Sequence, residues 1–494
     1  MPYDVVISLI PPYTINTPSL GVVSLYSFLK NKNINCIAFD FSAGFYHNEF
    51  KKLKVSNPFS FKINQFSLIG YALWYYKSID FFSIKDINQQ ILRSLSPIHL
   101  KLYNDLFRSL KSNIHSFYNI LERYAEKLSS LNTKHYCFSI NITNAIPTLK
   151  VIHDLRKYKK DAIIILGGAE VFPTYRKDLY INSELIDYVV YHYEGEIPLY
   201  KLIQALNNRD NLESCPGISF KNNDTLISTP LPQSLDLNSL PIPRYDEIEY
   251  GRFNFDDFRK LELLISKGCP GNCKFCNEPS IWSEFKSKKT SYLLKEIDHY
   301  LNQYGINEFE ISDNAFNNTN TFLRALQLLY DEKISLKFGG NCRINNMTIK
   351  KLKSYKKMGL THCFYGLESA SQKILDLMNK NLSIQHATDI IKNTSRLGID
   401  TILYLIVGYP AETDDDFNKT LTFLRENYQF INDISINIFT LMNNSPIFYS
   451  DEITKTPLPP SILNCYTYRT KDKISHDIRA SRFLKIKNVW NSLK

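Results

Sequence analysis

Residues 261–276 read LELLISKGCPGNCKFC, and this stretch decides how the whole chain is interpreted. It begins with an apolar run typical of a buried strand and continues into a Gly- and Pro-containing loop that holds Cys269, Cys273 and Cys276. The spacing of these cysteines is C-x3-C-x2-C. In enzymes built from parallel β/α units, the loops that follow the strands carry the chemistry. The stretch therefore predicts a functional loop behind the first strand of a β/α domain.

The number of thiols in this loop favours an iron–sulfur cluster over a zinc ion. Three thiolates hold three irons of a [4Fe–4S] cubane and leave the fourth iron open. A structural zinc ion requires four ligands, and no fourth Cys or His stands at a suitable spacing nearby. The other cysteines are scattered, which does not fit a disulfide framework: Cys36, Cys137, Cys215, Cys342, Cys363 and Cys465.

Downstream of the loop, strands and helices alternate at roughly 30 residues per unit, the usual size of a β/α unit. Apolar runs predict strands at 261–267, 308–312, 335–340, 362–366, 401–407 and 434–439. Such a series favours a partial (βα)6 barrel over a closed eight-stranded barrel. The basic C-terminal residues lack strand signals and predict helices packed on the barrel.

Upstream of the loop, a second alternating series predicts a doubly wound parallel sheet with helices on both faces. Its strands are expected at 3–9, 35–41, 135–142, 162–167 and 188–191. We therefore expect an α/β chain with a Rossmann-type domain, a partial barrel and a short helical tail. The boundaries are 1–230 for the first domain with a helical insertion at 44–133, 231–258 for a Pro-rich linker, 259–445 for the barrel and 446–494 for the tail.

The composition argues against several classes of protein. The formal charge of +10 is spread along the 494 residues without an aromatic–basic RNA motif, so we expect no nucleic-acid partner. No apolar run reaches the roughly 18 residues of a membrane span. The N-terminus has neither the basic region nor the cleavage site of a signal peptide. We therefore expect a cytoplasmic protein that does not enter membranes.

With Phe275 before the last cysteine, the loop has the form C-x3-C-x-aromatic-C and resembles the signature of the radical S-adenosylmethionine (SAM) superfamily. The resemblance extends over residues 261–448. It implies that Cys269, Cys273 and Cys276 ligate a [4Fe–4S] cluster whose open iron binds SAM. Reductive cleavage of SAM then yields a 5′-deoxyadenosyl radical. The resemblance also implies a small-molecule or peptide substrate and an electron donor such as flavodoxin or ferredoxin.

Two further segments resemble SAM contacts of the superfamily. Residues 366–369 (GLES) resemble its ribose-contacting turn, and residues 407–413 (VGYPAET) resemble its segment near the adenine. Each segment alone also fits a strand-to-helix turn with a capping acid. Arg343 is a candidate partner of the SAM carboxylate because a guanidinium can bind a carboxylate with two hydrogen bonds. The implied SAM-binding residues are Phe275, Arg343, Glu368, Ser369, Gly408 and Glu412.

Residues 18–21 (PSLG), the Gly167-Gly168 turn and residues 194–196 (EGE) occur in the order found in a cobalamin-binding domain. The upstream domain thus resembles the one that precedes many radical SAM cores. The resemblance implies a cobalamin site at the carboxyl ends of the strands, formed by Pro18, Leu20, Gly21, Gly167 and Gly168. Glycine lets the backbone approach a planar ring closely. Because the Asp-x-His-x-x-Gly motif is absent, either cobalamin binds without a histidine ligand or the domain is a scaffold.

These resemblances imply a radical SAM enzyme that uses cobalamin to methylate an unactivated carbon. A radical SAM cyclase, epimerase or rearrangement enzyme without cobalamin is the alternative. A non-catalytic iron–sulfur or zinc binding module is an alternative of another class. A methylthiotransferase is disfavoured because the upstream half has no second cluster-forming set of cysteines.

Overall fold

The computed structural model describes residues 2–13, 17–49, 114–141, 143–172, 174–282, 284–442, 444–457, 466–470 and 474–494. It divides into two compact units, which we describe separately. The described part of the first unit ends at Phe258, and that of the second begins at Arg259 and reaches the C-terminus. Most of the helical insertion expected at 44–133 lies outside the described residues.

The first unit contains a seven-stranded sheet in the order β2-β1-β3-β4-β5-β6-β7. Its parallel strands are β1 (Val5–Leu9), β2 (Cys36–Asp40), β3 (His135–Ser139), β4 (Ile163–Gly167) and β5 (Tyr188–Val190). The five strands predicted from apolar runs in this part of the chain are therefore confirmed. An antiparallel hairpin, β6 (Ile218–Asn222) and β7 (Thr225–Ser228), extends the sheet beyond β5. The sequence analysis missed it, although Asn223 and Asp224 at its tip have the positive φ angles of a tight turn.

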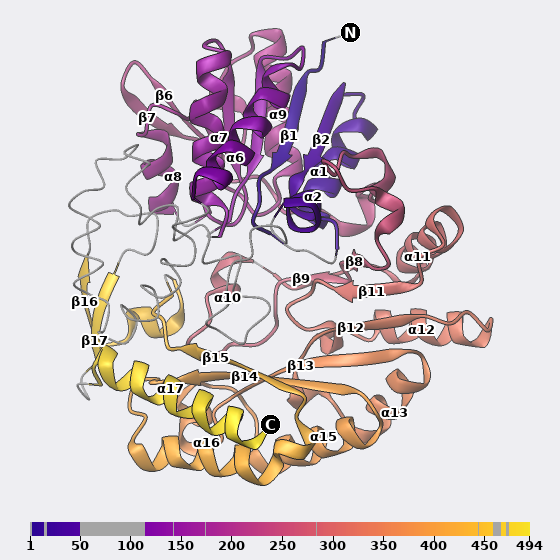
Figure 1. Ribbon diagram of the computed structural model, residues 1–494, viewed down its shortest axis with the longest axis vertical. Coiled ribbons are helices and arrows are strands. Elements are labelled where there is room, and N and C mark those ends of the chain that lie inside the picture. The colour runs from indigo at the N-terminus through magenta and orange to yellow at the C-terminus, as the bar shows by residue number, and fades with distance from the viewer. Residues whose placement is uncertain are drawn as a thin grey trace. The chain divides into compact units, whose positions relative to one another are not determined.

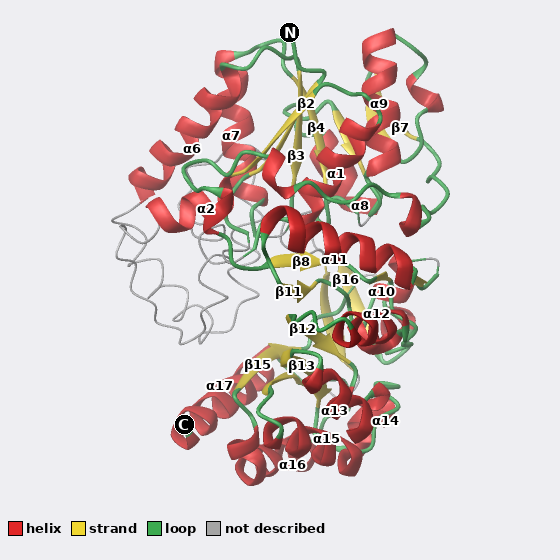
Figure 2. Cartoon of the chain, turned by 90° about the vertical axis from the view of Figure 1, so that its right-hand side faces the viewer, coloured by secondary structure: helices red, strands yellow, loops and turns green. Residues whose placement is uncertain are grey.

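Helices cover both faces of this sheet (Figure 2). One face carries α1 (Leu20–Asn31) and α9 (Glu196–Asn208), which contact each other. The other carries α6 (Ile114–Ser129) and α7 (Ala145–Tyr158), which also contact each other. Shorter helices are α2 (Phe41–Gly44) and α8 (Thr174–Ile181). Every residue of β1 is buried, as expected for a central strand between two helical layers.

The Pro-rich segment expected as a linker belongs to the first unit. Glu249 forms a parallel bridge with Phe39 of β2, and its backbone pairs with Ala38 and Asp40. The segment thus adds backbone hydrogen bonds at the β2 edge of the sheet, where unpaired N–H and C=O groups would otherwise be exposed.

The second unit contains a six-stranded parallel sheet in the order β15-β14-β13-β12-β11-β8 (Figure 1). The strands are β8 (Leu261–Leu263), β11 (Glu308–Ile311), β12 (Lys337–Cys342), β13 (Leu360–Glu368), β14 (Asp400–Val407) and β15 (Asp433–Ile438). The connecting helices are α11 (Thr290–Tyr304), α12 (Thr321–Asp331), α13 (Ile349–Lys357), α14 (Gln372–Leu377), α15 (Ile384–Arg396) and α16 (Asp414–Asn427). Short elements β9 (Ser266–Lys267), α10 (Glu278–Ile281) and β10 (Lys286–Ser287) follow β8. The predicted β/α series is confirmed.

The C-terminal segment differs from the expected helical tail. It begins with an antiparallel hairpin, β16 (Ile453–Pro457) and β17 (Tyr466–Thr470), before the helix α17 (His476–Leu493). The strands ITKTP and YTYRT have β-branched and aromatic residues but no apolar run, which is why the pattern was missed. α17 packs on β15, β14 and α16. Like the other helices of the described ranges, it is not both long and apolar enough to cross a membrane.

Candidate functional site

The three cysteines lie in the loop between β9 and α10 of the second unit. Gly268 opens this loop with a φ of 81°, a conformation that favours glycine. Cys273 is buried, Cys269 and Cys276 are half-buried, and all three are free thiols. The loop thus presents its thiols from a tight turn directly behind a strand, as the sequence predicted.

Contacts with distant segments fix the middle of the loop. The Lys274 N–H donates to the Met378 carbonyl, and the Lys274 carbonyl accepts from the Ile447 N–H, both at 2.9 Å. Cys276 N–H donates to the Cys273 carbonyl at 3.1 Å. Phe275 packs against a buried apolar group made of Ile374, Met378, Tyr409, Phe439, Leu441, Ile447 and Ile453. The spacing between the cysteines is therefore set by tertiary contacts as well as by the turn.

Three N–H groups point at the sulfur of Cys269. The Gly271 N–H lies 3.4 Å from Sγ, Arg343 Nη1 lies 3.6 Å from it, and Asn318 Nδ2 lies 3.9 Å from it. A Cβ on Gly271 would lie only 1.6 Å from Arg343 Nη1, so the guanidinium reaches this position because residue 271 is glycine. Donors around a sulfur stabilise the thiolate that a metal requires.

The donor set fits an iron–sulfur cluster. Burial raises the pKa of Cys276 to about 12, and the neighbouring thiols Cys273 and Cys269 act in the same direction. Bound metal removes this cost because a coordinating thiol is deprotonated outright. Among the described residues, no three Cys, His, Asp or Glu side chains converge on the position of a single metal ion. A cubane does not require such convergence, because each thiolate binds a different iron.

Glu368 ends β13 at an irregularity of the sheet. The β13–β14 register shifts between Gly366 and Glu368, and Glu368 has a φ of 68°. Its carboxylate accepts from Lys380 Nζ at 2.6 Å, and Lys380 Nζ lies 5.7 Å from the centre of the Phe275 ring. A Cβ on Gly366 would lie 2.4 Å from Glu368 Oε1, so this glycine makes room for the carboxylate. Lys380 thereby connects two residues of the predicted SAM-binding set.

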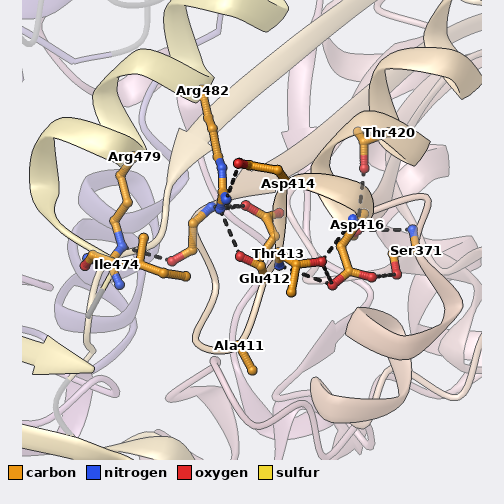
Figure 3. Close-up of polar contacts among 12 residues, drawn as sticks. Ser371, Ala411, Glu412, Thr413, Asp414, Asp416, Thr420, Ile474, Arg479 and Arg482 are labelled. Atoms are coloured by element: carbon orange, nitrogen blue, oxygen red, sulfur yellow. Dashed lines mark hydrogen bonds and ion pairs between the residues drawn. The ribbon is translucent and has the colours of Figure 1, made fainter. Parts of the chain in front are cut away.

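Ser369 points into the protein. It is buried, its hydroxyl lies 3.4 Å from Thr420 Oγ1, and the Ser371 N–H donates to its oxygen at 3.1 Å. Ser371 in turn donates to Asp416 Oδ1 at 2.7 Å (Figure 3). These contacts tie the turn after β13 to α16, which is the structural role that such a turn has in any β/α protein.

The carboxylate of Glu412 also faces inward (Figure 3). The Gly408 N–H donates to Glu412 Oε2 at 2.8 Å, and Arg482 Nη1 donates to the same oxygen at 2.7 Å. Burial raises the pKa of Glu412, while Gly408 and Arg482 favour its charged form. The acid that caps α16 is Asp416, in a capping box with Thr413. Glu412 therefore contacts its own turn and the C-terminal helix.

In the first unit, the loops that follow β1, β3 and β4 lie together at the expected cobalamin site. β1, β3 and β4 are parallel neighbours, so their carboxyl ends share one edge of the sheet. Asn144 donates from Nδ2 to the Ile10 carbonyl at 2.9 Å, and Thr143 donates to the Pro12 carbonyl at 3.0 Å. Pro18 and Leu20 are buried beside this edge, while Gly21 is exposed.

Gly167, the last residue of β4, and Gly168, which follows it, are glycines for different reasons. Gly168 has a φ of 107°, and a Cβ there would lie 2.4 Å from the Ile140 carbonyl oxygen. Gly168 is thus required by backbone packing inside the unit. A Cβ on Gly167 would make only ordinary contacts with Val190, at 3.8 Å. Close approach of a ligand is therefore best probed at Gly167.

Sequence reasoning missed the residues that contact the predicted ones from elsewhere in the chain. They are Asn318 and Lys380 around the cysteine loop, and Arg479 and Arg482 beside the Glu412 turn. No motif marks them, and the basic C-terminal residues were expected only to form helices packed on the barrel. The available signal for the two arginines is that they stand on a helix expected to pack on the barrel. An arginine that is buried in such a helix requires hydrogen-bond acceptors.

A model of the radical SAM superfamily matches residues 263–424, and this part of the chain is a radical SAM domain. An uncharacterized methyltransferase of Pyrococcus horikoshii is 26% identical over 277 residues, which cover 55% of this chain and 59% of that protein. The anaerobic magnesium-protoporphyrin IX monomethyl ester cyclase of Cereibacter sphaeroides is 26% identical over 315 residues, 60% of this chain and 50% of that protein. Both alignments span less than two thirds of the relative.

A solved structure with a similar fold is found among radical SAM enzymes. It is the radical SAM methyltransferase TsrM from Kitasatospora setae, solved with cobalamin and a [4Fe–4S] cluster bound. The TM-score is 0.67 at 11% identity, and the match covers 100% of this chain and 89% of that one. The predicted α/β architecture and the resemblance to radical SAM enzymes are confirmed. A radical SAM domain implies a [4Fe–4S] cluster and SAM, which agrees with the expected cofactors.

Proposed function

We propose that this radical SAM domain and the unit before it form a cobalamin-dependent methyltransferase that acts on an unactivated carbon. The observation that carries the proposal is the C-x3-C-x2-C loop, fixed behind β9 with three donors aimed at Cys269. The fold shared with TsrM, whose structure contains both cobalamin and a cluster, supports the same assignment. The proposal includes a cytoplasmic location and an electron donor for the cluster such as flavodoxin or ferredoxin.

Each part of the second unit has a role in this proposal. Cys269, Cys273 and Cys276 would hold three irons of the cluster, and the fourth iron would remain open to SAM. When bound, the cluster supplies the electron that cleaves SAM. Phe275 and the apolar group behind it keep water from the loop. Glu368, held by Lys380, accepts hydrogen bonds from the ribose hydroxyls.

In the first unit, the loops behind β1, β3 and β4 are the proposed cobalamin site. Gly167 is the proposed position of close approach, because a Cβ there would make only ordinary contacts with Val190, and Pro18, Leu20 and Gly21 form the neighbouring loop. The Asn144 and Thr143 hydrogen bonds hold these loops in place before a ligand arrives. Pre-formed loops reduce the ordering cost of binding.

The cluster is tested by replacing Cys269, Cys273 and Cys276 together with Ala and purifying the full chain without oxygen. We expect the unmodified protein to carry about four irons and to form 5′-deoxyadenosine from SAM with dithionite. The triple variant should do neither. Cys215→Ala removes a buried thiol of the first unit and should change neither result. A triple variant that still holds a full complement of iron would refute the proposed ligands.

Methyl transfer is distinguished from a second candidate by its products. The cyclase of Cereibacter sphaeroides among the relatives supports a radical cyclisation that transfers no methyl group. With SAM, dithionite and hydroxocobalamin, a methyltransferase should form S-adenosylhomocysteine only when cobalamin is present. A cyclase should form 5′-deoxyadenosine but no S-adenosylhomocysteine, whether or not cobalamin is present. Formation of neither product by cluster-loaded protein would favour a non-catalytic binding module.

A further inference from the structure

The C-terminal helix α17 brings two buried arginines to the turn between β14 and α16 (Figure 3). Arg479 is 0% exposed and Arg482 is 6% exposed. Arg479 Nε donates to the Gly408 carbonyl at 2.8 Å, and Arg482 Nη1 donates to the Glu412 carbonyl at 3.0 Å and to its carboxylate at 2.7 Å. Arg482 Nη2 reaches Asp414 Oδ1 at 2.9 Å. The helix therefore holds both ends of the turn.

Arg479 is itself fixed from the other side. Its Nη1 donates to the Ile474 carbonyl at 2.6 Å, and its Nη2 lies 3.5 Å from Thr470 Oγ1. Thr470 ends β17, and Ile474 stands just before α17. One guanidinium thus connects Thr470 and Ile474 to the Gly408 carbonyl.

The turn adopts a conformation that its own sequence does not favour. Gly408 has a φ of 73° and Ala411 a φ of 66°. A non-glycine residue with such a φ is strained, and the conformation persists only where surrounding contacts impose it. A Cβ on Gly408 would lie 2.2 Å from Arg479 Cγ, so glycine and arginine also depend on each other sterically.

Docking a helix does not require buried guanidinium groups. Apolar residues of similar volume often pack with equal or better stability, because charges must be removed from water. The arginines fix the conformation of the turn, because each N–H group donates to a particular oxygen atom in it. The backbone N–H and carbonyl of Gly408 are both bound, by Glu412 and Arg479 respectively.

We infer that Arg479 and Arg482 are positioning residues for SAM. They hold the backbone of residues 408–412 in the shape that meets the nucleoside, and Glu412 acts through Arg482 without touching SAM. The inference rests on the proposed function, because this turn is a SAM contact only if residues 407–413 act as the adenine segment of radical SAM enzymes that they resemble. It assigns a role in cofactor binding to a C-terminal helix that carries no recognised motif.

The test is a double-mutant cycle on SAM affinity. The cluster-loaded chain, Arg482→Met, Glu412→Gln and the double variant are compared by the Kd for SAM. Losing hydrogen bonds to a charged group should weaken SAM binding by about ten- to a hundredfold in each single variant. The double variant should be no weaker than the weaker single variant, because both residues act through one contact. Additive losses, or unchanged affinity in the single variants, would overturn the inference.

A matched control lies one turn further along the same helix. Lys485 is exposed, and Lys485→Met makes the same chemical change without reaching the turn, so SAM affinity should stay unchanged. Iron content and Tm are measured for every variant. If Arg482→Met loses iron, Arg482→Lys is compared instead. This variant keeps the positive charge but cannot donate from two separate nitrogens. Weaker SAM binding by that variant supports the inference, and wild-type affinity overturns it.

Failure of the inference and failure of the proposed function give different results. If the unmodified, cluster-loaded chain does not bind SAM, the proposed function is wrong and the inference falls with it. If that chain binds SAM and the variants bind equally well, only the positioning role is wrong.

Discussion

Arg343 links the third strand of the radical SAM domain to the cysteine loop. The Arg343 carbonyl accepts from Asn317 Nδ2, and the Arg343 N–H donates to Asn317 Oδ1. In the side chain, Nε donates to Asn345 Oδ1 at 3.2 Å. These contacts leave Nη1 near Cys269 Sγ, at 3.6 Å. Hydrogen bonds and positive charge near a cluster sulfur favour the reduced state, which carries one more negative charge.

Arg343→Met should therefore make the reduction potential of the cluster more negative. A hydrogen bond to a charged group of about 1.5 kcal/mol corresponds to roughly 60 mV for one electron. The measurement is a redox titration followed by electron paramagnetic resonance. Gly271→Ala should shift the potential in the same direction, because the added methyl group displaces the guanidinium. Arg396→Met, at an exposed position on α15, should leave the potential unchanged, and an unchanged value for Arg343→Met would contradict the assignment.

At the scale of elements, Asp313 fixes the strand that leads into the cysteine loop. It follows β11 and is buried, and it accepts from the Ile265 N–H at 2.7 Å and from the Ser266 hydroxyl. Asn341 of β12 donates to the Asp313 carbonyl at 3.1 Å. Burial raises the pKa of Asp313 to about 7, against the opposing effect of these donors. The connection from β8 to β9 therefore rests on a carboxyl group that holds its proton unusually well.

Stability should consequently fall as pH rises through the pKa of Asp313. The folded pKa of about 7 lies above the ordinary value of 3.8. The folded state thus binds the proton more tightly, and this stabilisation is lost between about pH 4 and pH 7. We expect the Tm of the unmodified chain minus that of Asp313→Asn to decrease from pH 5 to pH 8. A difference that is constant over this range would show that Asp313 ionises normally.

At the scale of the whole molecule, the two proposed cofactor sites belong to different compact units. The cysteine loop belongs to the second unit, and the glycine turn after β4 to the first. Each unit has its own sheet and its own buried core. Cofactor binding in one unit should therefore survive changes at the ligands of the other.

Gly167→Leu should abolish cobalamin binding and leave the iron content unchanged. The leucine fills the space beside Val190 that the ring would occupy, whereas Gly167→Ala should fold normally and weaken binding less. Hydroxocobalamin binding is followed by absorbance, and iron is assayed in the same sample. The triple cysteine variant should show the opposite pattern, retaining cobalamin without iron. Wild-type cobalamin binding by Gly167→Leu would move the site away from this turn and leave the first unit as a scaffold.

Local patterns predicted most of the fold. The apolar runs that became β1 to β5 are visible because a parallel strand buried on both faces is almost continuously apolar. The strands of the second sheet, such as β14, alternate buried and less buried residues, and they were predicted from shorter apolar runs in a β/α series. The cysteine loop is equally local, since its ligands lie within eight residues. The hairpin β6–β7 at one end of the first sheet and the separate two-stranded sheet β16–β17 were missed because their strands are short and partly polar.

What the sequence by itself determined is the order of the elements and the place of the thiols, because both depend on neighbours along the chain. Only the tertiary structure decided which side chains these residues meet. Glu412 accepts a hydrogen bond from Arg482, which is 70 residues away in the sequence, and Arg343, 74 residues from Cys269, donates to its sulfur. Gly168 is required by Ile140, which lies on the neighbouring strand's loop. Such contacts depend on the packing of whole strands and helices, and they leave no periodic signal in the sequence because each involves one particular pair of positions.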